Sequence, residues 1–449
     1  MAEKTNVIFI LSDDQGVWAS GCYGNDEIKT PNIDKLAEEG IRFENFFVAT
    51  PVCSPSRATI LTGKIPSQHG IHDWIKKGNV GPDAISYLEG EICYTDIFAK
   101  NGWSCGISGK WHLGNSQIPQ HGFVDWYVHQ TGGGDYNKAP MVKNGQLIIE
   151  NGYITDRITD MAIEYLEKYV KNNIPFYLSV HYTAPHSPWT GHPEDIVKSY
   201  KNCPFNSCPQ EPRHPWAINL TDECLGKREM LEGYFAAVTA MDINIGRIIE
   251  KVNELGIREN TLIIFMSDNG FSCGHKGFWG KGNGTNPRNM YENSIKVPFI
   301  ISHPGKLPEN KVIKSLVSAY DIFPTLLEYL HLPVPKKENL PGRSFLPLLK
   351  EDEEKTNEEV FIFDEYGPVR MIRNEEWKYV YRHAYGPHEL YNLKRDPKET
   401  DNLIDKPEYR EIIRELKEKM DRWFSRYVIP SRDGLKEDGT QMGQLHLIR

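Results

Sequence analysis

A short stretch near residue 50 combines a possible sulfur nucleophile, an anion-binding side chain and a helix start. Cys53-Ser-Pro55-Ser-Arg57 is followed by an apolar run and by Gly63, a residue type that commonly ends a helix. Because Pro55 suits a first helical turn, Cys53 lies at a predicted helix N-terminus, where free N–H groups and the helix dipole favour an anion. Arg57, about one turn further on, can reach the same anion. Taken alone, the string is equally consistent with a buried cysteine before an ordinary helix.

Two pairs of oxygen-bearing residues each follow a run of strand-forming residues. Asp13 and Asp14 come directly after an apolar run, and Asp268 and Asn269 follow a second one. Ligands of open parallel sheets bind at the carboxyl ends of the strands, so the two pairs can converge there. Carboxylate and amide oxygens suit calcium or magnesium and disfavour zinc, and neighbouring carboxylates need a cation to remain ionised. Each pair alone is more often a simple turn after a strand.

Further basic side chains follow other predicted strands and loops. Lys110 and His112 come directly after one short strand, and His186 follows another. Lys281 lies soon after the second oxygen-bearing pair. Any one of these residues alone would more often be a surface charge or a satisfied loop residue. Their combination with Cys53 and the carboxylates predicts a site for an anionic substrate.

Together these motifs resemble those of type I sulfatases, the formylglycine-dependent members of the alkaline-phosphatase-like superfamily. The resemblance covers the C-x-P-x-R signature that begins at Cys53, the stretch Gly109-Lys-Trp-His-Leu-Gly114, and essentially the whole chain. It implies that a separate maturating enzyme oxidises Cys53 to formylglycine, whose hydrate attacks the sulfur of a sulfate ester. It also implies one divalent cation, with Ca²⁺ preferred over Mg²⁺. The implied metal ligands are Asp13, Asp14, Cys53, Asp268 and Asn269.

The resemblance also assigns roles to the basic residues. Arg57, Lys110 and Lys281 would stabilise the negative charge on the sulfate oxygens in the transition state. His186 would protonate the departing alkoxide, with Lys281 as the second choice, and His112 would take up the proton when sulfate is expelled. The implied catalytic set is Cys53, Arg57, Lys110, His112, His186 and Lys281.

Length, charge and cysteine content limit the classes of function. The 449 residues, 39% of them hydrophobic, are enough for two domains with sizeable cores. The net charge of −9 argues against general binding to nucleic acid, and no stretch approaches the length of a membrane-spanning helix. The absence of a leader before residue 7 predicts a cytoplasmic protein, although a trimmed secreted chain would look the same. The eight cysteines show no disulfide framework, but Cys203, Cys208 and Cys224 could form a small metal or disulfide knot.

Strands that alternate with amphipathic helical stretches predict the fold class. The pattern runs to about residue 349 and indicates an α/β fold, with a large, mostly parallel mixed sheet between layers of helices. The expected helices include residues 32–39, 155–171, 228–255 and 321–331. A charged run over residues 350–359 predicts a boundary between a catalytic domain (1–355) and a C-terminal subdomain (356–449). That subdomain is expected to be an antiparallel sheet with a helix over residues 407–424.

Aromatic and hydrogen-bonding residues near these motifs are typical of a sugar-binding rim. The rim is expected to contain His72, Asp73, Trp74, Asp135, Trp189 and Arg288, together with His69, Tyr136, His192, Arg213, Arg382 and His383. We therefore expect a sulfated mono- or oligosaccharide, attacked from one end, as the substrate.

Two alternatives remain. One is a phosphonate or phosphate diester hydrolase of the same superfamily, although such relatives typically have Gln and His where this chain has Asp14 and Asn269. The other is a non-enzymatic carbohydrate-binding relative, which would be expected to have lost ligands that this chain retains.

Overall fold

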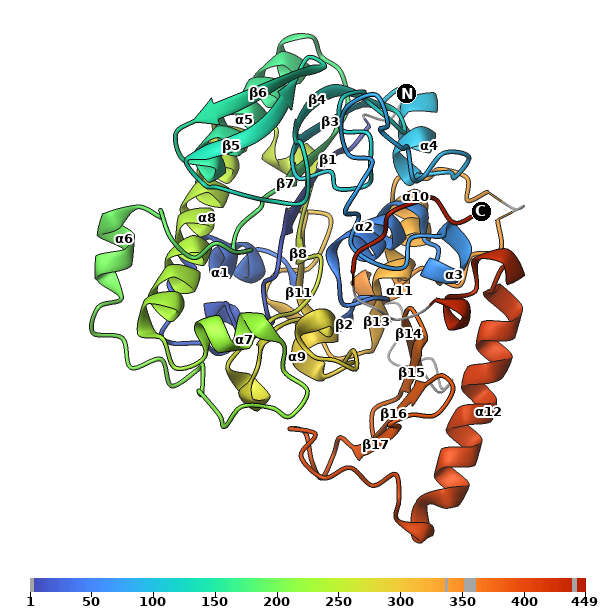
Figure 1. The fold of residues 1–449 in the computed structure, drawn as a ribbon. Helices are drawn as coiled ribbons and strands as arrows, with labels where there is room; N and C mark the ends of the chain where they lie inside the picture. The colour runs from blue at the N-terminus through green and yellow to red at the C-terminus, as the bar shows by residue number, and fades with distance from the viewer. Residues whose placement is uncertain (1–3, 336–337, 351–360, 438–441) are drawn as a thin grey trace.

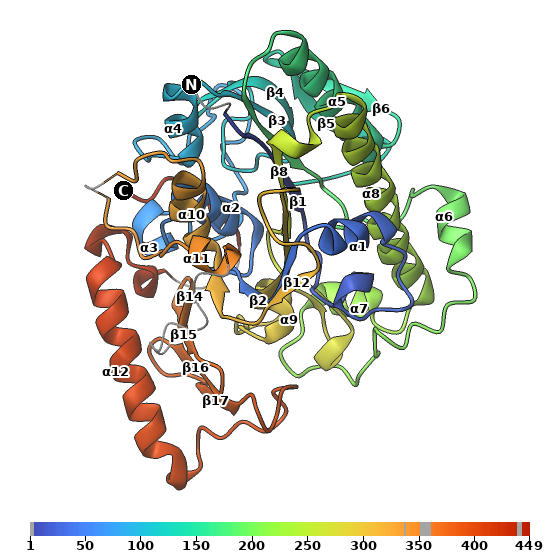
Figure 2. The ribbon, with the colours of Figure 1, turned by 180° about the vertical axis from the view of Figure 1, so that it is seen from behind.

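The computed structural model describes residues 4–335, 338–350, 361–437 and 442–449 (Figure 1). A large sheet runs through the molecule with helices on both of its faces, and a small sheet with one long helix lies beside it (Figures 1 and 2). The predicted α/β fold with a smaller C-terminal antiparallel-sheet-plus-helix subdomain is therefore confirmed.

The large sheet has 11 strands, and its centre is parallel. From edge to edge the order is β12 (Lys311–Ile313), β2 (Ile41–Phe47), β11 (Lys296–Ser302), β8 (Thr261–Ser267), β1 (Asn6–Ser12), β7 (Phe176–His181), β3 (Ser104–Gly109), β4 (Phe123–His129), β5 (Lys138–Lys143) and β6 (Gln146–Asn151), with β13 (Val317–Ser318) beside β2. β8, β1, β7, β3 and β4 are parallel to one another, whereas β11, β5 and β6 run antiparallel to their neighbours. The carboxyl ends of the central strands therefore meet at one edge.

The central strands are apolar on both faces because helices cover both faces. Every residue of β1 is buried, and its side chains alternate between two separate clusters. Phe9 belongs to a cluster with residues of α2 (Cys53–Thr62), α4 (Tyr94–Lys100), α10 (Ile322–Tyr329) and α11 (Leu346–Leu349). Ile8 and Ile10 belong to a cluster with residues of α1 (Pro31–Glu38), α5 (Ile154–Lys171) and α8 (Arg228–Glu254). The two helical layers hold the strand ends in a fixed position.

The C-terminal subdomain is a four-stranded antiparallel sheet covered by one helix. Its strands are β14 (Ile362–Tyr366), β15 (Val369–Arg373), β16 (Trp377–Arg382) and β17 (Glu389–Asn392). The helix α12 (Arg410–Tyr427), preceded by a 3₁₀ turn at Pro407–Tyr409, packs Leu416, Met420 and Phe424 against this sheet. The predicted boundary between residues 355 and 356, and most of the charged run before it, lie outside the described residues.

Several elements lie where the sequence gives no clear pattern. The β5–β6 hairpin is half exposed, and residues 191–221 form a long excursion that contains α6 (Glu194–Ser199) and leads into α7 (Asn219–Cys224). The remaining elements are α3 (Pro66–His69), α9 (Glu292–Ile295), β9 (Ser272–Cys273) and β10 (Trp279–Gly280), with 3₁₀ turns at Gly21–Tyr23, Arg258–Asn260, His275–Gly277, Gly282–Gly284, Ala319–Asp321, Pro430–Arg432 and Gly434–Lys436. All eight cysteines are free, so no disulfide joins Cys203, Cys208 and Cys224. None of the described helices is long and apolar enough to cross a membrane.

Residues 442–449 return to the large domain and run beside residues 70–76. Gln444 forms a parallel bridge with Ile75. The Gln444 main chain donates to the Trp74 carbonyl at 2.7 Å and accepts from the Lys76 amide at 3.0 Å, while its side chain bonds to His72 and Gly70. The chain's last described segment is thereby built into the loop that follows α3.

Candidate active site

The two oxygen-bearing pairs meet because β1 and β8 are parallel neighbours. Ser12 lies opposite Ser267 in the pairing register, and the Asp268 amide donates to the Ser12 carbonyl at 3.0 Å. The side chain of Asn269 donates through Nδ2 to Asp14 Oδ1 at 2.7 Å. Asp13, Asp14, Asp268 and Asn269 are all buried. The strand ends thus place three carboxyls and one amide in one small volume.

Cys53 is the first residue of α2 and faces this group. Its Sγ lies 3.4 Å from Asp13 Oδ1 and accepts from Lys281 Nζ at 2.7 Å. Val52 before it is extended, and Gly63 ends the helix in a left-handed conformation, so the helix has the bounds predicted from sequence. Ser54 Oγ donates to the His112 carbonyl at 2.9 Å, which fixes the start of α2 against the loop after β3.

Each buried cation of the site contacts a buried carboxylate. Arg57 donates through Nε to Asp268 Oδ2 at 2.8 Å, and its Nη2 lies at the same distance from that oxygen. Lys110 forms an ion pair with Asp13, and Lys281 forms one with Asp14. Breaking such a pair leaves an uncompensated charge in a dry environment, which is strongly unfavourable.

The oxygen cluster fits a hard divalent cation. Ligand atoms of Asp13, Asp14, Cys53 and Asp268 lie within 4.8 Å of one another, and Asn269 Oδ1 is a buried acceptor without a hydrogen-bond partner. Burial and the charge of Asp13 raise the pKa of Asp268 to about 6. Burial opposes ionisation of Asp13 too, but Lys110 and the other nearby cations lower its pKa overall. A bound cation would relieve the mutual repulsion and give Asn269 Oδ1 a partner.

The unmodified thiol of Cys53 is a poor nucleophile. Burial, and next the charge of Asp13, raise its pKa to about 12, although Lys110 and Lys281 act in the opposite direction. The thiolate is the reactive form of cysteine, and it is nearly absent at neutral pH with such a pKa. The position of Cys53 therefore suits chemistry other than direct attack by sulfur.

The two histidines of the site direct different ring nitrogen atoms toward it, Nδ1 in His112 and Nε2 in His186. His112 Nε2 lies 3.0 Å from the Ile75 carbonyl, which can only accept, so Nε2 carries the hydrogen and Nδ1 has a free lone pair. Burial, followed by the charge of Lys110, lowers the pKa of His112 well below its usual value, so the ring is neutral. His186 Nδ1 lies 2.8 Å from the Ser187 carbonyl, which leaves Nε2 toward the site, 3.8 Å from Asp14 Oδ2.

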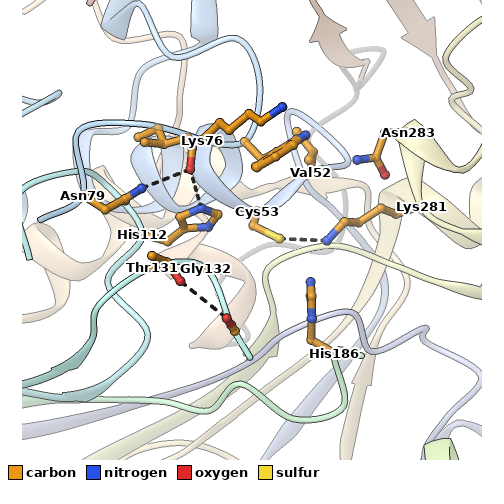
Figure 3. Close-up of a pocket in the computed structure, with 13 residues that line it drawn as sticks. Val52, Cys53, Lys76, Asn79, His112, Thr131, Gly132, His186, Lys281 and Asn283 are labelled. Atoms are coloured by element: carbon orange, nitrogen blue, oxygen red, sulfur yellow. Dashed lines mark hydrogen bonds between the residues drawn. The ribbon is translucent and has the colours of Figure 1, made fainter. Parts of the chain in front are cut away.

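These side chains line a cavity of about 360 Å³, within the range of small-ligand sites. Figure 3 shows Cys53, Lys281, His186 and His112 around this one space. The lining residues are Val52, Cys53, Trp74, Ile75, Lys76, Asn79, His112, Thr131, Gly132, Gly133, His186, Lys281 and Asn283. A smaller neighbouring cavity of about 170 Å³ shares His186, Lys281 and Asn283 and is also lined by Asp14 and Trp189.

The structure places only some of the predicted rim residues at these cavities. Trp74 lines the larger one and Trp189 the smaller one. Asp73 is instead buried in a network, because Arg288 Nη2 donates to Asp73 Oδ2 at 2.9 Å and the Tyr366 hydroxyl donates to Asp73 Oδ1 at 2.6 Å. The bond from Tyr366 connects the loop that contains Asp73 to the C-terminal subdomain.

The other predicted rim residues make contacts elsewhere. His72 Nε2 faces the Arg432 carbonyl, His69 Nε2 faces Thr59, and His192 Nδ1 faces the Tyr153 hydroxyl. The predicted rim residues that line neither cavity are His69, His72, Asp73, Asp135, Tyr136, His192, Arg213, Arg288, Arg382 and His383. Tyr136 supports the site indirectly, since its hydroxyl donates to the His186 carbonyl at 2.8 Å. The sequence alone contains no sign of these long-range partners.

Sequence reasoning missed several residues that line the larger cavity. Lys76, Asn79 and Asn283 contribute polar side chains, and Gly132 and Gly133 contribute main chain. A Cβ at Gly132 would lie 2.4 Å from His112 Cε1, so only glycine lets this loop approach the imidazole. The run of three glycines after β4 is the signal that could have indicated this close approach.

Comparisons with known proteins agree with this geometry. A family model for sulfatases matches residues 5–332, and one for the C-terminal region of N-sulphoglucosamine sulphohydrolase matches residues 278–425. An N-acetylglucosamine-6-O-sulfatase of Bacteroides thetaiotaomicron is 28% identical, over 95% of this chain and 87% of its own. An ulvan-active sulfatase of Formosa agariphila is 30% identical, over 93% of this chain and 81% of its own.

One solved structure extends the comparison to three dimensions. It is a protein in complex with its substrate D-glucosamine-2-N,6-O-disulfate, 25% identical to this chain with a TM-score of 0.80, covering 97% of this chain and all of the other. The family match spans most of the chain, including the ends of β1 and β8 and the start of α2. The chain belongs to the sulfatase family and is a sulfuric ester hydrolase.

Proposed function

We propose that this sulfatase removes sulfate from carbohydrate monoesters, acting from one end of the sugar, with formylglycine at position 53 and one divalent cation. The observation that supports this most directly is the position of Cys53, at a helix N-terminus facing the three buried carboxyls and Lys281. The sugar class is supported by relatives named for sulfated sugars and by a cavity large enough for one ring.

Asp13, Asp14, Asp268 and Asn269 would hold the cation, with Ca²⁺ preferred over Mg²⁺ because it accepts irregular oxygen coordination. The cation would supply fixed positive charge beside the sulfate oxygens. Formylglycine, made from Cys53 by a maturating enzyme, would supply as its hydrate the hydroxyl that attacks sulfur.

The buried cations of this chain would stabilise the charge that develops on sulfate. Lys281 lies against Cys53 Sγ, and Lys110 and Arg57 lie behind it on Asp13 and Asp268. Because these groups are fixed in a water-poor site before the substrate arrives, little reorganisation is needed as the S–O bond breaks. Their effect is therefore larger in the transition state than in the ground state.

The two histidines would move protons at defined atoms. His112, neutral and with a free lone pair at Nδ1, would accept the proton released when sulfate leaves. His186 would donate a proton from Nε2 to the departing sugar alkoxide, since its Nδ1 is occupied by the Ser187 carbonyl. The two rings face the same cavity from different loops, which separates the two roles.

Peptide mass spectrometry combined with activity measurement tests the proposal. Active protein should contain formylglycine at position 53, and protein produced without a maturating enzyme should contain the thiol and turn over little substrate. Full activity from protein that is wholly thiol would defeat the mechanism. Turnover of a phosphodiester faster than any sulfate ester would favour the diester hydrolase alternative.

A further inference from the structure

Lys76 is a cation on the cavity wall that no carboxylate of the described residues neutralises. Lys281, the other lysine that lines the cavity, is paired with Asp14. Lys76 is exposed, and among the described residues its ammonium group makes no hydrogen bond or ion pair. The ammonium group instead lies over the ring of Trp74, whose centroid is 5.8 Å from Nζ. A positive charge is therefore available to a ligand beside the sulfate pocket.

The segment that bears this lysine is fixed in position. Ile75 forms a parallel bridge with Gln444, whose main chain bonds to the Trp74 carbonyl and to the Lys76 amide. The Ile75 carbonyl accepts from His112 Nε2 and from Asn79 Nδ2, as Figure 3 shows. Trp74 and Lys76 both line the cavity, and Lys76 Nζ lies over the Trp74 ring, so the two side chains present one joint surface. Substrate would meet an ordered pair of side chains there.

We propose that Trp74 and Lys76 form a subsite for a second anionic group, a sulfate or a carboxylate, on the substrate. This group would belong to the sugar that bears the scissile sulfate or to its neighbour. The enzyme would then select multiply charged sulfated sugars over those that are otherwise neutral. The inference rests on the proposed function, because it concerns the substrate of the same cavity.

The chemistry of the pair supports this selection. An indole face provides apolar contact for a sugar ring, and an ammonium group forms charge-assisted hydrogen bonds with sulfate or carboxylate oxygens. Because Lys76 is exposed, solvent screens the interaction, and we expect a preference of about fivefold, or about 1 kcal/mol. The same screening should make the preference decrease as ionic strength rises.

Steady-state kinetics on fully modified enzyme test the subsite. The probes share a 6-sulfate: N-acetylglucosamine-6-sulfate, D-glucosamine-2-N,6-O-disulfate, and a disaccharide that adds a uronic acid to the first sugar. Wild type should show a kcat/KM about fivefold higher for the two doubly charged probes, and Lys76→Gln should reduce this ratio to about one. Lys77→Gln is the matched control, because Lys77 is an exposed neighbour that does not line the cavity. A gain with the disulfate alone identifies the second group as sulfate, and a gain with the uronic acid disaccharide alone identifies it as carboxylate.

Two further measurements separate this inference from the proposed function. If sugar sulfates are not turned over at all, the preference can be measured instead as the ratio of kcat/KM for an aryl sulfate with an added carboxylate to kcat/KM for the same aryl sulfate without it. Calorimetric titration of the unmodified thiol form with the sugar probes gives the ratio from binding alone. A ratio near one in wild type, equal losses on all probes in Lys76→Gln, or the same loss in Lys77→Gln would overturn the subsite.

Discussion

Replacing Lys110 with methionine should remove one half of a buried ion pair and make the fold depend on the cation. The side chains of Lys110 and Asp13 are both fully buried, and Lys110 is the largest contributor among the charges that lower the pKa of Asp13. Methionine keeps most of the apolar stem of lysine and removes the ammonium group, with its charge and its hydrogen bond to Asp13. The variant therefore isolates the electrostatic contribution.

The expected magnitude follows from the burial of both partners. Breaking a fully buried pair costs about 3–5 kcal/mol, because the remaining charge has no compensation, whereas an exposed pair contributes about 1 kcal/mol or less. Without divalent cations the free energy of unfolding of the variant should be about 3–5 kcal/mol lower than that of the wild type. With saturating Ca²⁺ the loss should fall markedly, because the cation replaces the missing positive charge at Asp13.

The same variant should shift the acid sensitivity of the protein. The folded pKa of Asp13 is lowered, so its contribution is present above the unfolded pKa of about 3.9 and is lost as pH falls through the folded pKa. In Lys110→Met the folded pKa rises, and the loss should begin at a higher pH. Activity should fall about 10²- to 10³-fold as well, as when one stabilising donor is removed from a catalytic site.

Chemical denaturation in chelator and in excess Ca²⁺ measures these effects. Lys35→Met serves as the control, because the pair of Lys35 with Glu39 is exposed, with 65% and 37% of the two side chains accessible. If Lys110→Met costs no more than Lys35→Met in chelator, the buried pair does not have the assigned role. If Ca²⁺ restores both variants equally, or neither, the cation does not act at Asp13.

Three further predictions concern the metal, the acid and the glycine loop. Chelation should abolish turnover and Ca²⁺ or Mg²⁺ should restore it, but not in Asp268→Ala; zinc found there by elemental analysis would contradict the oxygen site. His186→Ala should reduce kcat on a sugar sulfate by about 10²- to 10⁴-fold and on an activated aryl sulfate by far less, since a phenolate needs less protonation; equal losses would remove His186 from the acid role. Gly132→Ala should displace His112 and lower kcat by about 10- to 100-fold, whereas Gly134→Ala, whose nearest new contact is an ordinary 3.6 Å, should not; similar rates for both would show that the close approach is unimportant.

The sequence predicted the meeting of the strand ends and the helix start at Cys53 because both depend on short-range patterns. Asp13 and Asp268 each end an apolar strand, and parallel pairing brings such ends together. The order of residues around Cys53 likewise determines a helix start, which the structure confirms. These features depend on local propensity and on one general rule of sheet topology.

The wall of the cavity was predicted poorly because its contacts are long-range. Asp73 belongs to a loop expected at the rim, but its partners Arg288 and Tyr366 lie 215 and 293 residues away and bury it. Gly132 and Gly133 line the cavity without any side chain that suggests chemistry. Lys76 differs from many surface lysines only through its position beside Trp74. That position depends on main-chain hydrogen bonds to Gln444, a residue distant in sequence.

The contacts of Gln444 with residues 70–76 can form only late in synthesis, which would matter to any enzyme that must reach Cys53. In the finished fold the Cys53 side chain is only 3% exposed, so a modifying enzyme could hardly grip the chain around it. Residues 442–449 leave the ribosome after all other described residues, and Gln444 lies 372 residues beyond its partner His72. At usual rates of synthesis that separation corresponds to about 20–70 seconds. During this interval residues 70–76, whose Ile75 amide bonds to Ser54 beside Cys53, have not yet received their contacts with Gln444, so an enzyme that modified Cys53 would meet a less enclosed side chain.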